Sequence, residues 1–118
     1  MQRVTSGHTM MFPPLLGTVQ NCANVCEHMV PMMLGMTDVQ ARRNQIRLLI
    51  DCAKICHTLS SYLASLSPMA QGTAALCARI CEMCGNECAR FPDQHSQMCA
   101  QVCLHCAQEC WAYASTAG

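Results

Sequence analysis

Residues 77–88 read CARICEMCGNEC and residues 99–110 read CAQVCLHCAQEC, so the cysteine spacing C-x3-C-x2-C-x3-C occurs twice in succession. Steps of four, three and four residues follow the 3.6-residue turn of an α-helix and keep the four cysteines of a segment on one face. The two segments therefore predict two consecutive helices, each with a stripe of four cysteines. Two further helices of this kind are predicted by shorter pairs with the same first step: Cys22/Cys26 and Cys52/Cys56.

Proline and capping signals divide the chain into four predicted helices with short connections. The start signals are Pro13–Pro14, a Thr37–Gln40 capping box, Ser67–Pro68 and Asp93. The predicted helices span residues 13–35, 37–66, 67–90 and 93–115. We therefore expect an all-α fold, an antiparallel up-down-up-down four-helix bundle over residues 13–118 that follows a flexible tail over residues 1–12.

The cysteine stripes are expected to face one another inside the bundle. Facing residues of an antiparallel hairpin have a constant residue-number sum, and the stripes of the third and fourth helices satisfy this rule with a turn near Asp93. The stripes of the first two helices satisfy it with a turn near Asp38. The predicted layers are Cys22/Cys56/Cys77/Cys110, Cys26/Cys52/Cys81/Cys106, Met29/Leu49/Cys84/Cys103 and Met33/Gln45/Cys88/Cys99.

The same arithmetic predicts a soft, polar-tolerant end to this cysteine-lined core. Four side chains with sulfur or nitrogen donors are expected to point inward there: Met29, Met33, Met36 and His95. A second group of such side chains, His8, Met10 and Met11, lies in the predicted tail. Methionine is more often an ordinary gap-filling core residue, and an inward histidine equally has a structural use, so these positions are candidate ligands only.

The composition excludes several function classes. Only 12% of the residues are charged and the net charge is +0, which gives no basic surface for nucleic acid or anionic membranes. The one basic cluster, Arg42, Arg43 and Arg47, is interpreted as a solvated helix turn. No apolar run approaches the roughly 18 residues of a membrane span. No signal peptide is recognised, so we expect a cytoplasmic protein without nucleic-acid or membrane partners.

Three chemistries compete to explain 12 cysteines on core-facing stripes. Buried cysteine acts as a small hydrophobe, but a core built largely of it would pack loosely. Structural disulfides are typical of cysteine-rich secreted chains, yet successive cysteines on one helix face are poorly placed to form them. The third chemistry is metal binding. A thiol enzyme is not expected, because it needs one low-pKa cysteine beside a base.

The candidate metals are zinc, iron–sulfur clusters and Cu(I). The pairs Cys81-x2-Cys84 and Cys103-x2-Cys106 resemble zinc or iron–sulfur ligands, which keeps such a module open as the alternative. Structural zinc prefers closed tetrahedral sites, and twelve buried thiolates would carry twice the charge of three zinc ions. Monovalent Cu(I) balances the thiolates one for one and also accepts thioether ligands. A copper-responsive DNA-binding regulator would need a basic surface, which the net charge does not provide.

On these residues the chain resembles the bacterial copper storage proteins, a family of cysteine-lined four-helix bundles. The resemblance covers the chain from about Pro14 onward and is strongest in CARICEMCGNECARFP and MCAQVCLHCAQEC. It implies non-enzymatic storage of many Cu(I) ions for sequestration or supply, a homotetramer, and copper chaperones or copper enzymes as partners. The G-H-x-M segment at residues 7–10 is similar to exported members, so an exported form stays open.

The resemblance also implies which residues bind the metal. The His/Met mouth through which the family takes up copper is matched by Met29, Met33, Met36 and His95. The storing thiolates would be Cys22, Cys26, Cys52, Cys56, Cys77, Cys81, Cys84, Cys88, Cys99, Cys103, Cys106 and Cys110.

Overall fold

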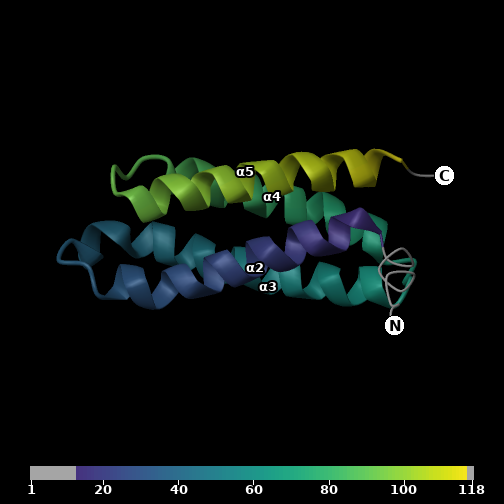
Figure 1. The fold of residues 1–118 in the computed structure, drawn as a ribbon, viewed down its shortest axis with the longest axis horizontal. Coiled ribbons are helices and arrows are strands. Elements are labelled where there is room, and N and C mark those ends of the chain that lie inside the picture. The colour runs from purple at the N-terminus through teal and green to yellow at the C-terminus, as the bar shows by residue number, and fades with distance from the viewer. Residues whose placement is uncertain (1–12, 117–118) are drawn as a thin grey trace, which may run out of the picture.

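The computed structural model of the chain describes residues 13–116 and contains four α-helices and one short 3-10 helix there. The elements are α2 (Pro14–Leu34), η1 (Val39–Arg42), α3 (Arg43–Ala64), α4 (Ala70–Cys88) and α5 (Gln94–Ser115). Within the described residues no strand occurs, which confirms the predicted all-α bundle (Figure 1). The predicted tail, with His8, Met10 and Met11, lies outside the described residues.

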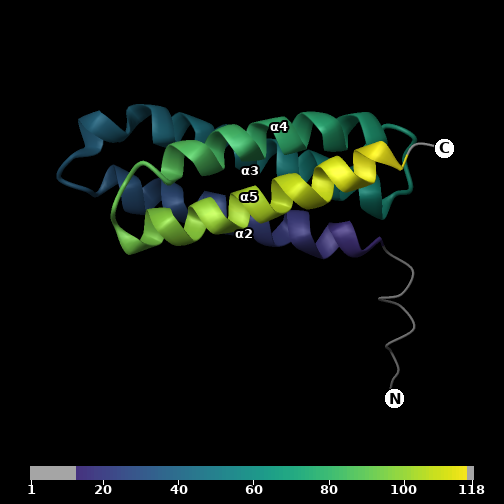
Figure 2. The same cartoon turned by 90° about the horizontal axis from the view of Figure 1, so that it is seen from above.

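The helices form two antiparallel hairpins, α2 with α3 and α4 with α5, that lie side by side (Figures 1 and 2). The α2–α3 and α4–α5 connections lie at one end of the bundle, and the α3–α4 connection lies at the other. This is the predicted up-down-up-down arrangement. No helix in residues 13–116 is long and apolar enough to cross a membrane.

Two of the four helix starts are confirmed. Pro14 occupies the first turn of α2, where its missing N–H costs no hydrogen bond. Asp93 caps α5, because its Oδ2 accepts a hydrogen bond of 3.0 Å from the backbone N–H of Ser96. The connection between the two hairpin helices α4 and α5 is therefore placed as the sequence predicts.

The other two starts differ from the prediction. The capping box of Thr37 and Gln40 is wrong, since a 3-10 turn over Val39–Arg42 precedes α3 and no side chain caps it. Asp38 instead accepts a hydrogen bond of 2.7 Å from Arg42 Nε, which draws this turn around the arginine. Ser67 does accept a hydrogen bond from the backbone N–H of Met69, but only a turn follows directly, and α4 begins at Ala70.

The α3–α4 connection contains a leucine in the left-handed backbone region. The N–H of Ser67 bonds to the carbonyl of Tyr62 and the N–H of Leu66 bonds to that of Leu63, which together form a Schellman motif. Leu66 takes the position that glycine usually holds, with φ 56°. Its side chain is 76% exposed, so it gains little burial in return.

Replacement of Leu66 by glycine is expected to stabilise the bundle by about 1 kcal/mol, because a left-handed residue with a Cβ is strained by about that amount. Chemical denaturation of the metal-free protein measures this change. The matched control is Leu76→Gly, which removes an exposed leucine from the interior of α4 and should destabilise the protein. A destabilising effect of Leu66→Gly would contradict the assignment of strain to this residue.

The two helices that carry four cysteines each approach closely at Gly85. A Cβ built on this residue would lie 2.7 Å from Leu104 Cγ and 3.2 Å from the carbonyl oxygen of Ala100. The absent side chain lets α4 and α5 come together and bring their cysteine stripes into contact. The far end of the core is apolar, with Leu15, Leu59, Leu63, Ala70 and Ala74 all buried.

Candidate metal centre

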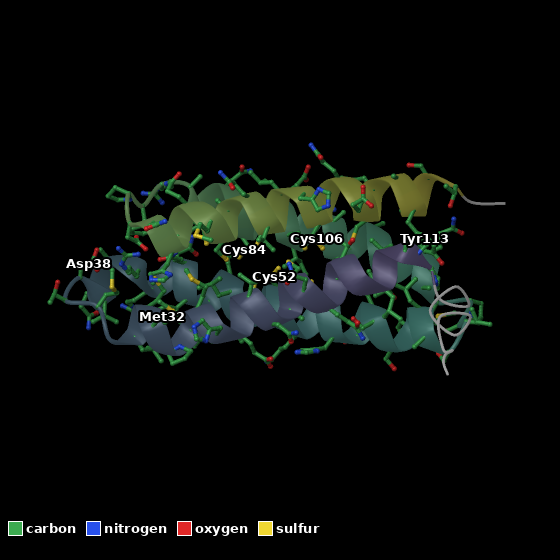
Figure 3. The ribbon with its side chains drawn as sticks, in the orientation of Figure 1. Met32, Asp38, Cys52, Cys84, Cys106 and Tyr113 are labelled. Carbon is green, nitrogen blue, oxygen red and sulfur yellow. The ribbon has the colours of Figure 1, made fainter. Side chains whose placement is uncertain are left out.

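All twelve cysteines are buried, none more than 1% exposed, and all twelve are free thiols. Their sulfur atoms extend along the bundle axis between the two hairpins. Figure 3 shows this arrangement with Cys84, Cys52 and Cys106 labelled from the Asp38 end toward the Tyr113 end. None of the twelve cysteines forms a disulfide, so the structure does not support the disulfide interpretation. The cysteines form a reduced core instead.

The predicted pairing between neighbouring helices is present. Cys52 Sγ lies 3.6 Å from Cys81 Sγ, and Cys56 Sγ lies 3.6 Å from Cys77 Sγ, across the α3–α4 seam. In α4 and α5, each α4 thiol is close enough to its predicted partner for the pair to alter its pKa. These pairs are Cys77/Cys110, Cys81/Cys106, Cys84/Cys103 and Cys88/Cys99.

The predicted flat layers are wrong for α2. Cys26 Sγ lies 3.5 Å from Cys103 Sγ, whereas the layers pair Cys26 with Cys106. Cys22 Sγ likewise lies 3.9 Å from Cys52 Sγ, whereas the layers place Cys22 with Cys56. Cys52 and Cys56 keep their predicted partners on α4, so the shift belongs to α2. The α2 stripe is consequently staggered against the others.

The stagger produces overlapping groups of four thiols. In each group the four sulfur atoms lie within 4.8 Å of one another. The groups are Cys22/Cys52/Cys56/Cys81, Cys22/Cys26/Cys52/Cys103 and Cys56/Cys77/Cys81/Cys106, called below the central, the methionine-side and the apolar-side cluster. Neighbouring clusters share two thiols, so three clusters draw on only eight cysteines.

This sharing decides which metal chemistry fits. Separate tetrahedral zinc sites need four thiolates each, so the eight cysteines of the three clusters would complete only two of them. Thiolates that bridge two ions suit a soft cation with a low coordination number, and Cu(I) is the cation that such ligands select. The core is thus better suited to a chain of linked soft cations than to separate divalent sites.

The thiols also interact electrostatically. Hydrogen bonds from Cys103 and Cys26 lower the pKa of Cys84 to about 7, whereas hydrogen bonding to Cys22 raises the pKa of Cys103 above the ordinary range. A thiolate is therefore stabilised only while its neighbours stay protonated. Full deprotonation of the core requires bound cations, one positive charge for each thiolate.

A buried polar cluster, which the sequence did not predict, closes the end of the core where Met29, Met33 and Met36 lie. Arg42 is only 3% exposed, which contradicts its interpretation as part of a solvated turn. Its Nη1 donates to Gln45 Oε1 at 3.1 Å, to Ser96 Oγ at 3.3 Å and to Met33 Sδ at 3.2 Å. We call Arg42 with Asp38, Gln45, Asp93 and Ser96 the Arg42 cluster.

Two carboxylates neutralise this arginine. Asp38 Oδ1 lies 2.7 Å from Arg42 Nε, and Asp93 Oδ1 lies 2.9 Å from Arg42 Nη2. Burial opposes the charge of Arg42, but hydrogen bonds to Asp38 and Asp93 outweigh it and raise the guanidinium pKa. Burial likewise opposes the charge of Asp93, but hydrogen bonds from Ser96 and from Arg42 outweigh it and lower the carboxyl pKa. The Phe91 ring lies 4.5 Å from the guanidinium and covers it.

The predicted methionine and histidine ligands are not all brought together. Met29 and Met33 are buried in the same core as the thiols, and Met36 is half-buried. The inward prediction for His95 is wrong, because His95 is exposed and Ser96 is buried in its place. Both positions lie about 50° from the centre of the α5 cysteine stripe, on opposite sides. The hydrogen bonds of Ser96 to the Arg42 cluster decide between them.

A sequence signal for part of this cluster does exist. Gln45 belongs to a predicted inward layer, and its Nε2 does contact Cys88 Sγ at 3.5 Å and Ser96 Oγ at 2.8 Å. Arg42 precedes Gln45 by three residues, so the two share a helix face. Nothing comparable in the sequence indicates Ser96.

A four-helix bundle with a reduced core of overlapping thiol clusters defines the class of a soft-metal-binding protein. Comparison with known proteins is more specific. The chain belongs to the copper storage protein family (Csp), which matches residues 12–115.

Relatives with known sequences or structures agree with this assignment. The uncharacterized cysteine-rich protein YhjQ of Bacillus subtilis is 35% identical over 77 residues, which cover 65% of this chain and 71% of YhjQ. The Cu(I)-bound copper storage protein BsCsp3 is 35% identical with a TM-score of 0.80, covering 85% of this chain and 94% of BsCsp3. The apo form of copper storage protein 3 from Bacillus subtilis is 33% identical with a TM-score of 0.80, covering 85% and 95%.

Proposed function

We propose that this protein stores several Cu(I) ions in its core and holds them on the thiolates of its twelve cysteines. The observation that carries the proposal is the chain of overlapping four-thiol clusters, buried and reduced, in a member of the copper storage family. Two or three sulfur atoms bind each ion, and shared thiolates link neighbouring ions. Copper held in this way is kept from redox cycling, whether for detoxification or for later supply.

The methionines and His95 have lesser roles in this proposal. Met29 is buried in the same core as the thiols and offers its thioether to the ions on that side. Met33 becomes a ligand only if it gives up the hydrogen bond that its Sδ accepts from Arg42. Met36 and His95 lie closer to solvent and bind ions only in passing. No residue is assigned a catalytic role, because the family stores copper and the thiols share one buried core.

The assembly and location of the protein are proposed from the family resemblance. We propose a cytoplasmic homotetramer that exchanges copper with chaperones or copper enzymes. An exposed apolar strip on α4, with Leu76 50% and Met83 53% exposed, supports association between copies. Light scattering of the purified protein tests the tetramer directly.

Anaerobic titration of the reduced protein with Cu(I), against a competing chelator, is expected to give at least about three ions per chain, one for each four-thiol cluster. Each thiol loses its proton when it binds copper as a thiolate, so loading at neutral pH should release protons and weaken as the pH falls. Proton release in a weakly buffered solution with a pH indicator measures this alongside the copper content.

Titration with zinc under the same conditions is the matched comparison. A zinc or iron–sulfur module would saturate with a few divalent ions or show cluster absorbance on isolation. Saturation with Cu(I) at about one or two ions per chain would contradict storage. So few ions, with two or three sulfurs each, would leave most of the cysteines without copper.

A further inference from the structure

A surface pocket along the seam between α2 and α5 is lined by soft metal donors. Its cavity measures ≈ 310 Å³. Its donor side chains are His28, Met29, Met32, His95, Met98 and Cys99. Met29 and Cys99 are buried, whereas Met98 is 56% exposed and both histidines are exposed. The pocket therefore has a solvent-facing rim and a floor that reaches the core.

Helix spacing gathers these donors on facing edges of two helices. His28 and Met32 are one turn apart on α2, and His95 and Met98 are one turn apart on α5. Each helix thus contributes one imidazole and one exposed or half-buried thioether to the same cavity. Imidazole and thioether together suit Cu(I) and are poor ligands for the hard cations of the cytoplasm. Figure 3 places Met32 on α2 near the Asp38 end of the bundle.

A neighbouring cavity on the same seam lacks this chemistry. It measures ≈ 410 Å³ and is lined by Gly17, Thr18, Asn21, Gln101, Val102 and His105, with no sulfur among them. Looseness of the α2–α5 seam alone therefore does not account for the donors in the first pocket.

The end of the bundle is a poor route for a cation. The Arg42 cluster lies between solvent and the last cysteines, and its guanidinium is buried and permanently charged. Arg42 also donates a hydrogen bond to Met33 Sδ, so the thioether nearest this end is already engaged. A Cu(I) ion that entered along the axis would have to displace this buried, ion-paired cluster and break the hydrogen bond to Met33 Sδ.

The floor of the pocket connects directly to the thiol clusters. Cys99 Sγ lies 3.9 Å from Cys103 Sγ, which lies 3.5 Å from Cys26 Sγ. Cys103 and Cys26 both belong to the methionine-side cluster. An ion at Cys99 is therefore one sulfur-to-sulfur step from a four-thiol site.

We propose that Cu(I) enters the core sideways, through a capture site that His28, Met32, His95 and Met98 form over Cys99 at the α2–α5 seam. This inference rests on the proposed storage function. Cu(I) binds first to imidazole nitrogen and thioether sulfur. It then forms a bond to the Cys99 thiolate as those bonds break, and the thiol proton passes to solvent. Copper stays in the +1 state throughout, so no oxidant or reductant is needed.

The test is the rate at which reduced protein takes Cu(I) from its bicinchoninate complex, followed anaerobically by stopped-flow absorbance. The pocket variant combines His28→Gln, Met32→Leu, His95→Gln and Met98→Leu, none of which changes a cysteine. We expect uptake to slow by about tenfold, the effect of a tenfold weaker transient complex, while the final copper content stays unchanged.

Two control variants make the outcome specific. The combination His105→Gln and Met69→Leu removes exposed donors outside this pocket and should leave the rate unchanged. Met36→Leu removes a half-buried thioether at the axial end. Slower uptake by Met36→Leu together with a normal rate in the pocket variant would overturn sideways uptake. A low final copper content in the unaltered protein would instead overturn storage itself, so the two failures are distinguishable.

Discussion

Replacement of Arg42 by methionine is expected to lower the free energy of unfolding by about 3 kcal/mol, the lower end of the range for breaking a buried ion pair. The change leaves Asp93 without its ion-pair partner and Gln45 Oε1 without the donor at 3.1 Å. Methionine fills a similar volume, so the loss reports on charge and hydrogen bonding. We use the lower end of that range because the Asp38 side chain is 48% exposed, so water can solvate its carboxylate once Arg42 is gone.

Chemical denaturation of the metal-free protein at neutral pH measures this loss. Arg43→Met is the matched control, since Arg43 is the next residue and is exposed. A surface substitution of this kind changes stability by no more than about 0.5 kcal/mol. Equal effects of the two substitutions would indicate that Arg42 is solvated, as the sequence suggested, and would contradict the buried polar cluster.

Acidification provides an independent check on the same interaction. Asp93 has a pKa below its usual value, and one cause is its contact with Arg42. Its contribution to stability is complete above the ordinary carboxyl pKa of about 3.9 and is lost as the pH falls through the lowered pKa. The difference between Arg42→Met and the unaltered protein should therefore shrink at acidic pH. A difference that does not change with pH would point to packing rather than charge.

The helices and the position of the cysteines follow from sequence because both depend on short-range rules. The four-three-four spacing leaves one helix face for the thiols, and cysteine is small enough to be buried there. The pairing of α4 with α5 follows from a single turn, which Asp93 fixes by capping the second helix. These features required no knowledge of distant contacts.

Features that depend on several segments at once were not predictable in this way. Arg42 is charged, and composition rules place such residues at the surface. Its burial requires carboxylates from two different connections, Asp38 and Asp93, to meet above the core. The choice between His95 and Ser96 depends on the same cluster. The stagger of α2 is a relation between this helix and its neighbours, which residue spacing within one helix does not determine.

The stagger has a consequence for how copper is distributed among the thiols. Cys22 and Cys52 each belong to both the central and the methionine-side cluster, whereas Cys88 and Cys110 belong to none of the three. All four side chains are fully buried, with an exposed fraction of 0%. Pairs chosen from these cysteines therefore differ in connectivity while matching in chemistry and burial.

Replacement of both Cys22 and Cys52 by alanine is expected to remove about one third of the stored copper, because these two thiols fill four of the twelve ligand positions in the three clusters. Replacement of both Cys88 and Cys110 should remove only about one sixth, in proportion to two thiols out of twelve. Anaerobic Cu(I) titration of the two double variants measures both losses.

Each variant loses two buried sulfur atoms from the core, so the packing losses of the two should be similar. Denaturation of the metal-free forms can verify this. Twelve independent thiols would give equal copper losses in the two variants, and that result would contradict linked clusters. A larger loss from Cys22 and Cys52 would instead show that storage depends on shared thiolates. The overlap created by the stagger of α2 would then determine how much copper the bundle holds.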